Sequence, residues 1–258
     1  MISIKNETFD IEAFESGRQL AEIEKSMLGA LNEHPETFRF DSSKQLLFEL
    51  KLRGAIIQSS RRLNRSGMSF EVFRKSKCNE AYWDRMANGG FSLKSSVKPS
   101  DAIRDIFING RKYATECATA MVIVYYGALL ELYSEELFNK LFPVIHLMNW
   151  HDIDRNLREI GIMNKEKLYL PGDRRYFDNP DVDPETPYWQ GENVIDLGNG
   201  QYYGHGIGIG DAEVFIRALN RNRKEDADES AYFMDACARP NFKRLHSIQE
   251  RFELNRIL

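Results

Sequence analysis

Hydrophobic side chains fill almost every position of one stretch of the chain, residues 113–126 (YATECATAMVIVYY). A helix that is apolar on all sides is normally buried, so this pattern predicts a helix through the middle of the fold. Thr115 can cap its start, Glu116 then falls in the first turn, and Cys117 occupies the second helical position. The polar end of this helix is therefore the first place to look for chemistry.

Two interpretations of Cys117 are open at this point. A thiol beside unsatisfied backbone N–H groups and the positive end of a helix dipole has a lowered pKa, which suits a nucleophile. Free cysteine is also among the most buried residue types and commonly acts as a small apolar filler. The segment alone does not separate a nucleophile from a filler.

Helical spacing of apolar residues predicts further helices in both halves of the chain. We expect Asp41 or Ser42 to cap a helix that Gly67 ends, Ser100 to cap one that ends at Asn109-Gly110, and Ser134 to cap another. The predicted helices cover residues 11–31, 43–66, 101–108, 135–142, 212–220, 229–238 and the tail 239–258.

Alternating patterns and turn residues predict strands, mostly after residue 143. The expected strands are residues 91–97, 144–150, 168–170, 192–198 and 201–209. Asn199-Gly200 joins the last two, and Asn-Gly is the strongest short-range hairpin signal. The predicted fold class is α+β, with helices first and an antiparallel sheet after the cysteine helix.

Four arginines, Arg53, Arg61, Arg62 and Arg65, form a basic stripe on the helix that starts near Ser42. Such a stripe could contact phosphates, but in a chain of net charge −4 a solvated helix face is the favoured interpretation. The same charge balance argues against a dedicated nucleic-acid binder.

The three cysteines, Cys78, Cys117 and Cys237, are widely separated and odd in number, which predicts a reducing compartment and shows no metal-ligand spacing. The longest apolar run, residues 118–130, is shorter than the roughly 20 residues that cross a bilayer. The N-terminus has no pattern of a secretion signal. We therefore expect no membrane partner.

His205 is the candidate partner of the thiol, because a cysteine at a helix start followed by a histidine on a later strand is the order of papain-like enzymes. Gly204 and Gly206 flank it and leave room for another segment. The alternative is a histidine whose hydrogen bonds are satisfied within a sheet. The glycines of GHGIGIG do not have dinucleotide-binding spacing.

Six segments together resemble the bacterial spore-coat transglutaminases, which are protein-glutamine γ-glutamyltransferases. They lie between residues 48 and 209: FELKLR (48–53), AIRDIFINGRKYATECATAMVIVYY (102–126), NWHD (149–152), YFDNPDVDP (176–184), WQGENVIDLG (189–198) and YYGHGIGI (202–209). The resemblance implies a papain-like core, with the cysteine helix packed on an antiparallel sheet and extra helices at both ends. It also implies one transglutaminase domain over residues 1–258, with a helical lead-in (1–40) and a C-terminal tail (239–258).

The resemblance further implies the chemistry of the site. The nucleophile corresponds to Cys117, the main catalytic carboxylate to Glu192, a second carboxylate to Glu116 and a supporting histidine to His205. The aromatic lining of the substrate tunnel corresponds to Phe70, Trp150 and Trp189. No cofactor and no metal, calcium included, is expected. The implied partners are spore-coat proteins with reactive glutamine and lysine, in the mother-cell cytoplasm and the spore coat.

The group that activates the thiol stays open between Glu192, Glu116 and His205. A carboxylate of pKa about 4.3 facing a thiol of about 8.5 is mismatched by roughly 6 kcal/mol, and histidine by about half of that. Unassisted, His205 is the better base, whereas Glu192 needs a pKa raised by burial or by the charge of Glu116. These effects also raise the pKa of the thiol, so we expect a nucleophile less acidic than that of papain.

The thioester must also meet an amine rather than water. Trp150 and Trp189 could line a passage that sheds water from a lysine stem, although core packing is the alternative for both. Two other classes of protein remain: a papain-like amidase or peptidase that uses water, and a coat protein without activity.

Overall fold

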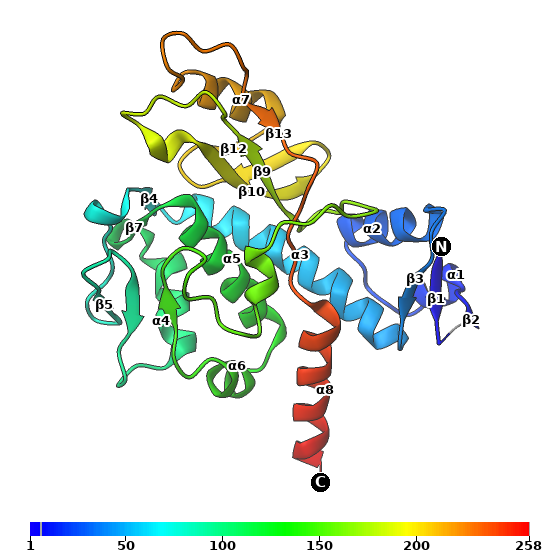
Figure 1. Ribbon diagram of the computed structural model, residues 1–258. Coiled ribbons are helices and arrows are strands. Elements are labelled where there is room, and N and C mark those ends of the chain that lie inside the picture. Colours follow the sequence, from blue (N-terminus) through cyan, green and yellow to red (C-terminus); the bar gives the residue numbers. More distant parts are fainter. Residues whose placement is uncertain (6, 258) are drawn as a thin grey trace.

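The computed structural model describes residues 1–5 and 7–257. A helical body is built around α3 (Ser43–Arg65) and α5 (Cys117–Leu132), and a five-stranded sheet covers one side of it (Figure 1). A smaller N-terminal unit lies against the first half of α3, and the C-terminal helix runs away from the sheet (Figure 1).

Helix α5 is buried along its length, as its sequence predicts. Every residue from Ala118 to Leu129 is buried, because α3 covers one side and the sheet and shorter helices cover the others. The Ser59 hydroxyl of α3 donates a hydrogen bond of 2.8 Å to the Val124 carbonyl. At Gly127 an added Cβ would lie 2.5 Å from the Ser59 hydroxyl, so the two helices are in close contact there.

Helix α3 starts and ends as predicted. The Ser42 side chain accepts a hydrogen bond from Gln45, and Gly67 follows the end with a φ of 83°, which glycine adopts without strain. The interpretation of Arg53 as part of a solvated stripe is wrong. Its side chain is fully buried and pairs with Asp173 and Glu49, because the chain after residue 170 crosses that face of α3.

Shorter elements complete the helical body. Pro99 is the first residue of α4 (Pro99–Ile108), so the prediction that Ser100 caps this helix is wrong, while Asn109 ends it as expected. Ser134 caps α6 (Glu135–Leu141), as predicted. The remaining elements here are β4 (Ser69–Phe70), η1 (Phe73–Lys75), β5 (Trp83–Arg85), β6 (Phe91–Leu93), η2 (Gly110–Lys112), β7 (Ala114–Thr115), β8 (His146–Leu147) and η3 (Arg158–Gly161).

The sheet after α5 is antiparallel, with the order β12-β11-β10-β9-β13. Its strands are β9 (Arg174–Asp178), β10 (Gly191–Gly198), β11 (Gln201–Gly204), β12 (Gly208–Gly210) and β13 (Tyr232–Phe233). Asn199 and Gly200 have φ of 53° and 70°, the left-handed pair that a tight hairpin turn needs. The predicted hairpin is confirmed.

The central strand β10 is buried on both faces: every residue except Asp196 is buried, including the polar Glu192 and Asn193. Ile195 and Leu197 join the core around α5. Val194 faces the other way and packs with Phe177 and Phe215 of α7 (Ala212–Asn220), whose rings stack with centroids 5.1 Å apart. The site residues of β10 are thus fixed by cores on two sides.

Four secondary-structure predictions in this half are wrong or too long. The strand expected at 201–209 is divided into β11 and β12 by a turn at residues 205–207. Residues 229–238 form no helix: Met234 N–H donates to the Tyr176 carbonyl and Ala238 N–H to the Arg174 carbonyl, so the segment runs along β9 as an extended chain. Residues 168–170 form no strand, and the strand expected at 144–150 is reduced to the two residues of β8.

The N-terminal residues are not simply a helical lead-in, which corrects that prediction. They contain β1 (Ile2–Ile4), β2 (Glu7–Thr8), α1 (Ile11–Glu15), α2 (Glu22–Glu33) and β3 (Phe38–Phe40). The strands form a three-stranded sheet, and Gly17, with a φ of 76°, interrupts what the apolar spacing predicts as one helix.

The predicted helix of the tail is confirmed as α8 (Phe242–Ile257). It packs on α3 through Phe242 and Leu245, and the Tyr133 hydroxyl donates a bond of 2.8 Å to the Leu245 carbonyl. Among the helices of the described residues, none is both long and apolar enough to pass through a membrane.

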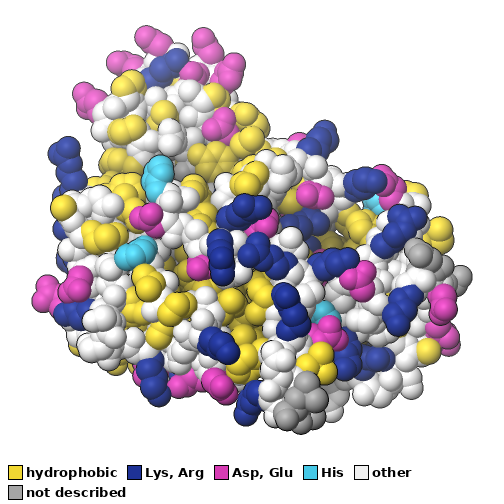
Figure 2. Space-filling model, turned by 60° about the horizontal axis from the view of Figure 1, so that its bottom comes forward, with side chains coloured by type: hydrophobic (Ala, Val, Ile, Leu, Met, Phe, Trp, Pro, Cys, Tyr) yellow, Lys and Arg dark blue, Asp and Glu magenta, His cyan; other side chains and the backbone are white. Residues whose placement is uncertain are grey.

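The five-stranded sheet and α7 form a lobe that stands above the helical body (Figure 1). Acidic side chains gather at the tip of this lobe, and basic ones are spread over the body (Figure 2).

Candidate active site

Cys117 is the first residue of α5, and its cap differs from the prediction. Glu116, not Thr115, is the N-cap: its carboxylate accepts hydrogen bonds from the backbone N–H groups of Ala118 and Thr119. Thr115 belongs to the short strand β7. Glu116 thus satisfies the free N–H groups of the helix start next to the thiol.

The same cap holds the loop that carries Trp150. The Thr119 hydroxyl donates to the Glu116 carboxylate and accepts a bond of 2.8 Å from the Asn149 backbone. Asn149 has a φ of 51°, and its side-chain oxygen accepts a bond of 2.6 Å from the Trp150 backbone. The position of Trp150 therefore depends on the start of α5.

A cavity of 460 Å³ opens over Cys117. The thiol is partly exposed at its wall, between the helix start and strands β9 and β10. The lining residues are Phe70, Phe73, Glu116, Cys117, Ala118, Asn149, Trp150, Gly161, Met163, Arg174, Tyr176, Tyr188, Gln190, Gly191, Asn193 and Met234.

Glu192 is buried on β10 near the thiol. A backbone N–H of His205 binds its carboxylate, and one oxygen, Oε1, has no hydrogen-bond partner among the described residues. At Gly204 an added Cβ would lie 2.8 Å from that oxygen, so the glycine makes room for the carboxylate. Burial, followed by the charge of Glu116, holds the pKa of Glu192 well above its usual range.

The thiol is kept in its neutral form. Burial raises the pKa of Cys117, and the nearby charges of Glu192 and Glu116 raise it further, while hydrogen bonds from Asn193 oppose this. Burial and the two carboxylates thus outweigh the lowering of the thiol pKa that the helix dipole is expected to cause. The prediction of a nucleophile that is weakly acidic agrees with this environment.

His205 is held by the protein rather than by the thiol. Its Nε2 lies 3.1 Å from the Ser69 carbonyl, which can only accept, so Nε2 carries the proton. Its Nδ1 lies 3.4 Å from the Tyr203 hydroxyl. Burial lowers the pKa of His205 to about 4, so the ring is neutral at physiological pH. Both ring nitrogens thus have partners other than the Cys117 sulfur.

Two of the three predicted tunnel aromatics line the cavity, and the third packs against one of them. Phe70 and Trp150 line it, whereas Trp189, in η4 (Pro187–Trp189), stacks on Phe70 with centroids 6.4 Å apart. Tyr188 reaches the cavity beside them. The structure thus brings Phe70, Trp189 and Tyr188 together on one side of the cavity.

Sequence reasoning missed two polar residues of this site, Arg174 and Asn193. The Asn193 amide donates a bond of 3.4 Å to the Cys117 sulfur, and Arg174 donates to the Asn193 side-chain oxygen. Asn193 lies inside the GEN motif next to Glu192. A signal for Arg174 existed in RRYFD, because a strand places two consecutive arginines on opposite faces and at least one of them must be buried.

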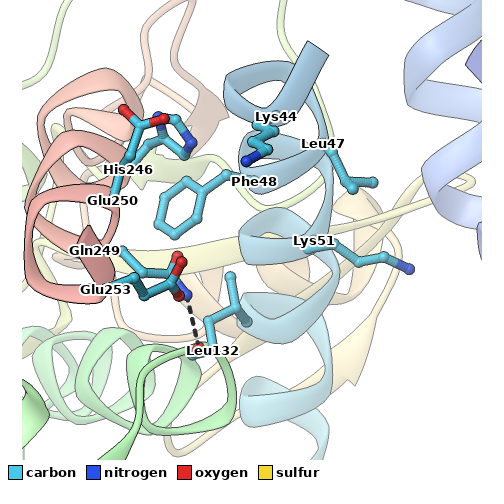
Figure 3. A pocket seen from close by; sticks show the side chains of 9 residues that line it. All are labelled: Lys44, Leu47, Phe48, Lys51, Leu132, His246, Gln249, Glu250 and Glu253. Atoms are coloured by element: carbon cyan, nitrogen blue, oxygen red, sulfur yellow. Dashed lines mark hydrogen bonds between the residues drawn. The ribbon is translucent and has the colours of Figure 1, made fainter. Parts of the chain in front are cut away.

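A second cavity, of 260 Å³, lies between α3 and α8 (Figure 3). It is lined by Lys44, Leu47, Phe48, Lys51, Leu132, His246, Gln249, Glu250 and Glu253. The Gln249 amide bonds the Leu132 carbonyl at 3.3 Å across its floor. No thiol faces this cavity within the part of the chain that the structure describes, in contrast to the cavity over Cys117.

Comparison with known proteins points to one family. A family model described as Protein-glutamine gamma-glutamyltransferase matches residues 1–249. A relative of the same name from Bacillus cereus (strain 03BB102) is 46% identical over 215 residues, which are 83% of this chain and 77% of the relative. One from Bacillus mycoides (strain KBAB4) is 45% identical over 215 residues, with the same coverage.

A solved structure is also similar, the transglutaminase from Geobacillus stearothermophilus without its C-terminal extension. It is 50% identical, superposes with a TM-score of 0.76, and the match covers 81% of this chain and 98% of that one. The fold, the cavity over Cys117 and these relatives lead to one conclusion: the chain belongs to the protein-glutamine γ-glutamyltransferase family.

Proposed function

We propose that this acyltransferase joins glutamine to lysine side chains with Cys117 as nucleophile and Glu192 as its base. The observation that carries the proposal is the partly exposed thiol at the start of α5 with a buried carboxylate of raised pKa beside it. A carboxylate with a raised pKa is a stronger base, which reduces the mismatch with the thiol.

In the first half of the reaction the Cys117 sulfur attacks the γ-carboxamide carbon of a protein glutamine. Glu192 takes the thiol proton and passes it to the departing nitrogen, so ammonia leaves and a thioester remains. In the second half a lysine amine attacks the thioester, Glu192 takes a proton from the amine, and the sulfur leaves and recovers a proton. An ε-(γ-glutamyl)lysine bond results.

Glu116 and His205 have supporting roles in this proposal. Glu116 caps α5 and, through its charge, keeps the pKa of Glu192 raised. His205 orients Glu192 through its backbone N–H, and its ring anchors the strand to Ser69. A neutral ring with both nitrogens occupied is a poor base, which favours Glu192 over His205 for the proton transfers.

The aromatic side chains are proposed to favour the amine over water. Phe70, Trp150 and Trp189, with Tyr188, give the lysine stem an apolar path to the thioester, and removal of water protects the thioester from hydrolysis. The proposed substrates are spore-coat proteins with reactive glutamine and lysine, in the mother cell and the spore coat. No calcium is invoked.

The test is transfer of a fluorescent primary amine to a glutamine-containing protein, with and without a chelator. We expect labelling by the wild type that a chelator does not change, loss of labelling in Cys117→Ala, and no loss in Cys78→Ala, whose thiol lies outside the cavity. Labelling that survives Cys117→Ala contradicts the proposal. Release of ammonia without labelling supports a papain-like amidase instead, and neither product supports a structural coat protein.

A further inference from the structure

Arg174 is a buried cation without a carboxylate partner among the described residues. Its side chain is 2% exposed, and its Nε donates a bond of 2.8 Å to the Ile160 carbonyl. Arg53, which is buried to the same degree, pairs with Asp173 and Glu49. Burial of an unpaired charge costs free energy, and the pKa of Arg174 is correspondingly lowered by burial. An arrangement with such a cost calls for an explanation.

We propose that Arg174 is a positioning residue for the transfer reaction and that Asn193 is the catalytic donor that it holds against the Cys117 sulfur. The inference deepens the proposed function and rests on it, since Cys117 is the nucleophile in both. The hydrogen bonds run from the guanidinium to the Asn193 oxygen, and from the Asn193 nitrogen to the sulfur.

The first argument is the direction of the Asn193 amide. An amide can present its oxygen or its nitrogen to a neighbour, and only the nitrogen stabilises a thiolate. Arg174 is a donor only, so it binds the oxygen and turns the nitrogen toward Cys117. Without the arginine the amide can rotate and present its oxygen, an acceptor, to the sulfur.

The second argument is that Arg174 itself cannot move away. Its guanidinium lies over the Trp150 ring, 4.4 Å from the centroid, and its Nε is bound to Ile160. Arg174 and Asn193 are near neighbours on paired strands, because Arg174 stands opposite Ile195 in the β9–β10 register. A planar, delocalised cation suits stacking and directed donation together.

The third argument is charge. Two carboxylates, Glu116 and Glu192, oppose formation of a thiolate at Cys117. Among the described residues that line the cavity, Arg174 is the one cation. Its charge polarises the Asn193 amide and strengthens the bond to the sulfur at the moment when the sulfur becomes negative. The site therefore holds a donor for the nucleophile as well as a base.

The test follows the alkylation of Cys117 by iodoacetamide from pH 6 to 10, with each cysteine resolved by mass spectrometry. Iodoacetamide is neutral, so removal of a charge does not change its approach. We expect the rate constant for alkylation of Cys117 at pH 9 to fall at least about tenfold in Arg174→Met and in Asn193→Asp. Loss of a hydrogen bond to a charged group raises the pKa of the thiol by about one to two pH units, which lowers the thiolate fraction. Arg174→Lys, which remains a donor only, restores part of the rate.

Two controls are built into the chain. Arg175→Met removes a buried arginine of the same strand that points to the other face and binds the Met234 and Ala236 carbonyls, and it should leave the Cys117 rate unchanged. The rate of Cys78, outside the cavity, should be the same in every variant and reports an intact fold. In the transfer assay Arg174→Met should lower kcat and leave KM for the glutamine substrate nearly unchanged.

Wild-type alkylation rates at Cys117 in both Arg174→Met and Asn193→Asp overturn the inference. If Arg174→Met does not fold, Asn193→Asp alone tests the inference, because the aspartate side chain keeps an acceptor for Arg174. A fall in the alkylation rate of Cys117 in this variant supports the inference, and an unchanged rate refutes it. The alkylation assay does not require transferase activity. A wild-type protein without transferase activity therefore refutes the proposed function, while the alkylation rates still test the inference about Arg174 and Asn193.

Discussion

At the scale of the residue, burial decides the chemistry of Cys117. The helix start would lower the pKa of the thiol, but burial and two carboxylates raise it, so the resting enzyme holds a neutral thiol beside Glu192. A neutral thiol is poorly reactive toward oxidants and chance electrophiles. The site thus becomes nucleophilic only when the proton is taken during attack.

Glu192→Gln should lower activity and raise stability. Loss of a general base costs about 10²–10⁴-fold in rate. Because the pKa of Glu192 is raised in the folded state, its ionisation destabilises the wild type as pH rises above the unfolded pKa of about 4.3. The variant should therefore melt higher than the wild type at pH 8 and at nearly the same temperature at pH 4.

Thermal unfolding at the two pH values, together with the transfer assay, checks this prediction. Glu225→Gln in the loop after α7 is the control, since Glu225 is exposed, has no ion pair among the described residues and should change neither quantity. A Glu192→Gln variant that melts below the wild type at pH 8, or that keeps full activity, contradicts the assigned environment.

His205 should make the protein acid-sensitive. Its pKa falls from about 6.5 in the unfolded chain to about 4 in the fold, so stability is complete above pH 6.5 and is lost as the pH falls toward 4. Between pH 7 and 4.5 the loss attributable to this ring is about 2 kcal/mol. In urea titrations, the free energy of unfolding of His205→Gln should therefore fall less than that of the wild type between pH 7 and 4.5, by about this amount.

The exposed His151 provides the comparison: in His151→Gln the acid loss should equal that of the wild type. Equal acid losses in the wild type and in His205→Gln would mean that the ring is not held neutral in the fold.

At the scale of the element, patterns that local physics determines were predictable. The apolar run of α5, the Ser42 and Ser134 caps and the Asn199-Gly200 turn are confirmed because each depends on neighbours in sequence. The extended segment 229–238 was not predictable, because pairing with β9 overrides its helical spacing. The Glu116 cap was missed because aspartate, asparagine and serine are the usual caps.

The contact between α3 and α5 should be intolerant of added volume. At Gly127 a Cβ would lie 2.4 Å from the Phe107 ring and 2.5 Å from the Ser59 hydroxyl, so Gly127→Ala should cost about 1–3 kcal/mol of unfolding free energy. Gly29 of α2 has nothing within 4 Å of the added carbon, so Gly29→Ala should stabilise by roughly 0.5–1 kcal/mol.

Denaturant unfolding of the two variants side by side measures both effects. Both variants replace glycine by alanine within a helix, so helix propensity changes equally in the two. The difference between their changes in unfolding free energy therefore measures the effect of packing. A Gly127→Ala protein as stable as the Gly29→Ala protein is inconsistent with the close approach of the two helices.

At the scale of the whole molecule, the cavity is assembled from segments far apart in the chain. Phe70, Cys117, Trp150 and Tyr188 come from β4, α5, a loop and η4. The motifs of the family led to Cys117 and Glu192 but not to Arg174, whose role depends on the β9–β10 register and on the ring beneath it. That the chain is one domain with a papain-like core stays a prediction.

Trp189→Ala should open the passage to water. Its ring supports Phe70 at the cavity wall, so its loss should lower amine incorporation relative to deamidation of the same glutamine. Trp83→Phe, a buried position of β5 away from the cavity, is a control for the replacement of a tryptophan elsewhere in the fold. Mass spectrometry of the glutamine peptide measures both products, and an unchanged ratio in Trp189→Ala refutes water exclusion by this ring.

The central claim, acyl transfer through Cys117, is tested most directly by trapping the intermediate. The protein is mixed with a glutamine peptide in the absence of amine, quenched in acid and weighed by mass spectrometry. We predict a species heavier by the peptide less one ammonia molecule, located on Cys117 by peptide mapping and discharged by added primary amine. An adduct on Cys78 or Cys237, or the same adduct in Cys117→Ala, would contradict the account.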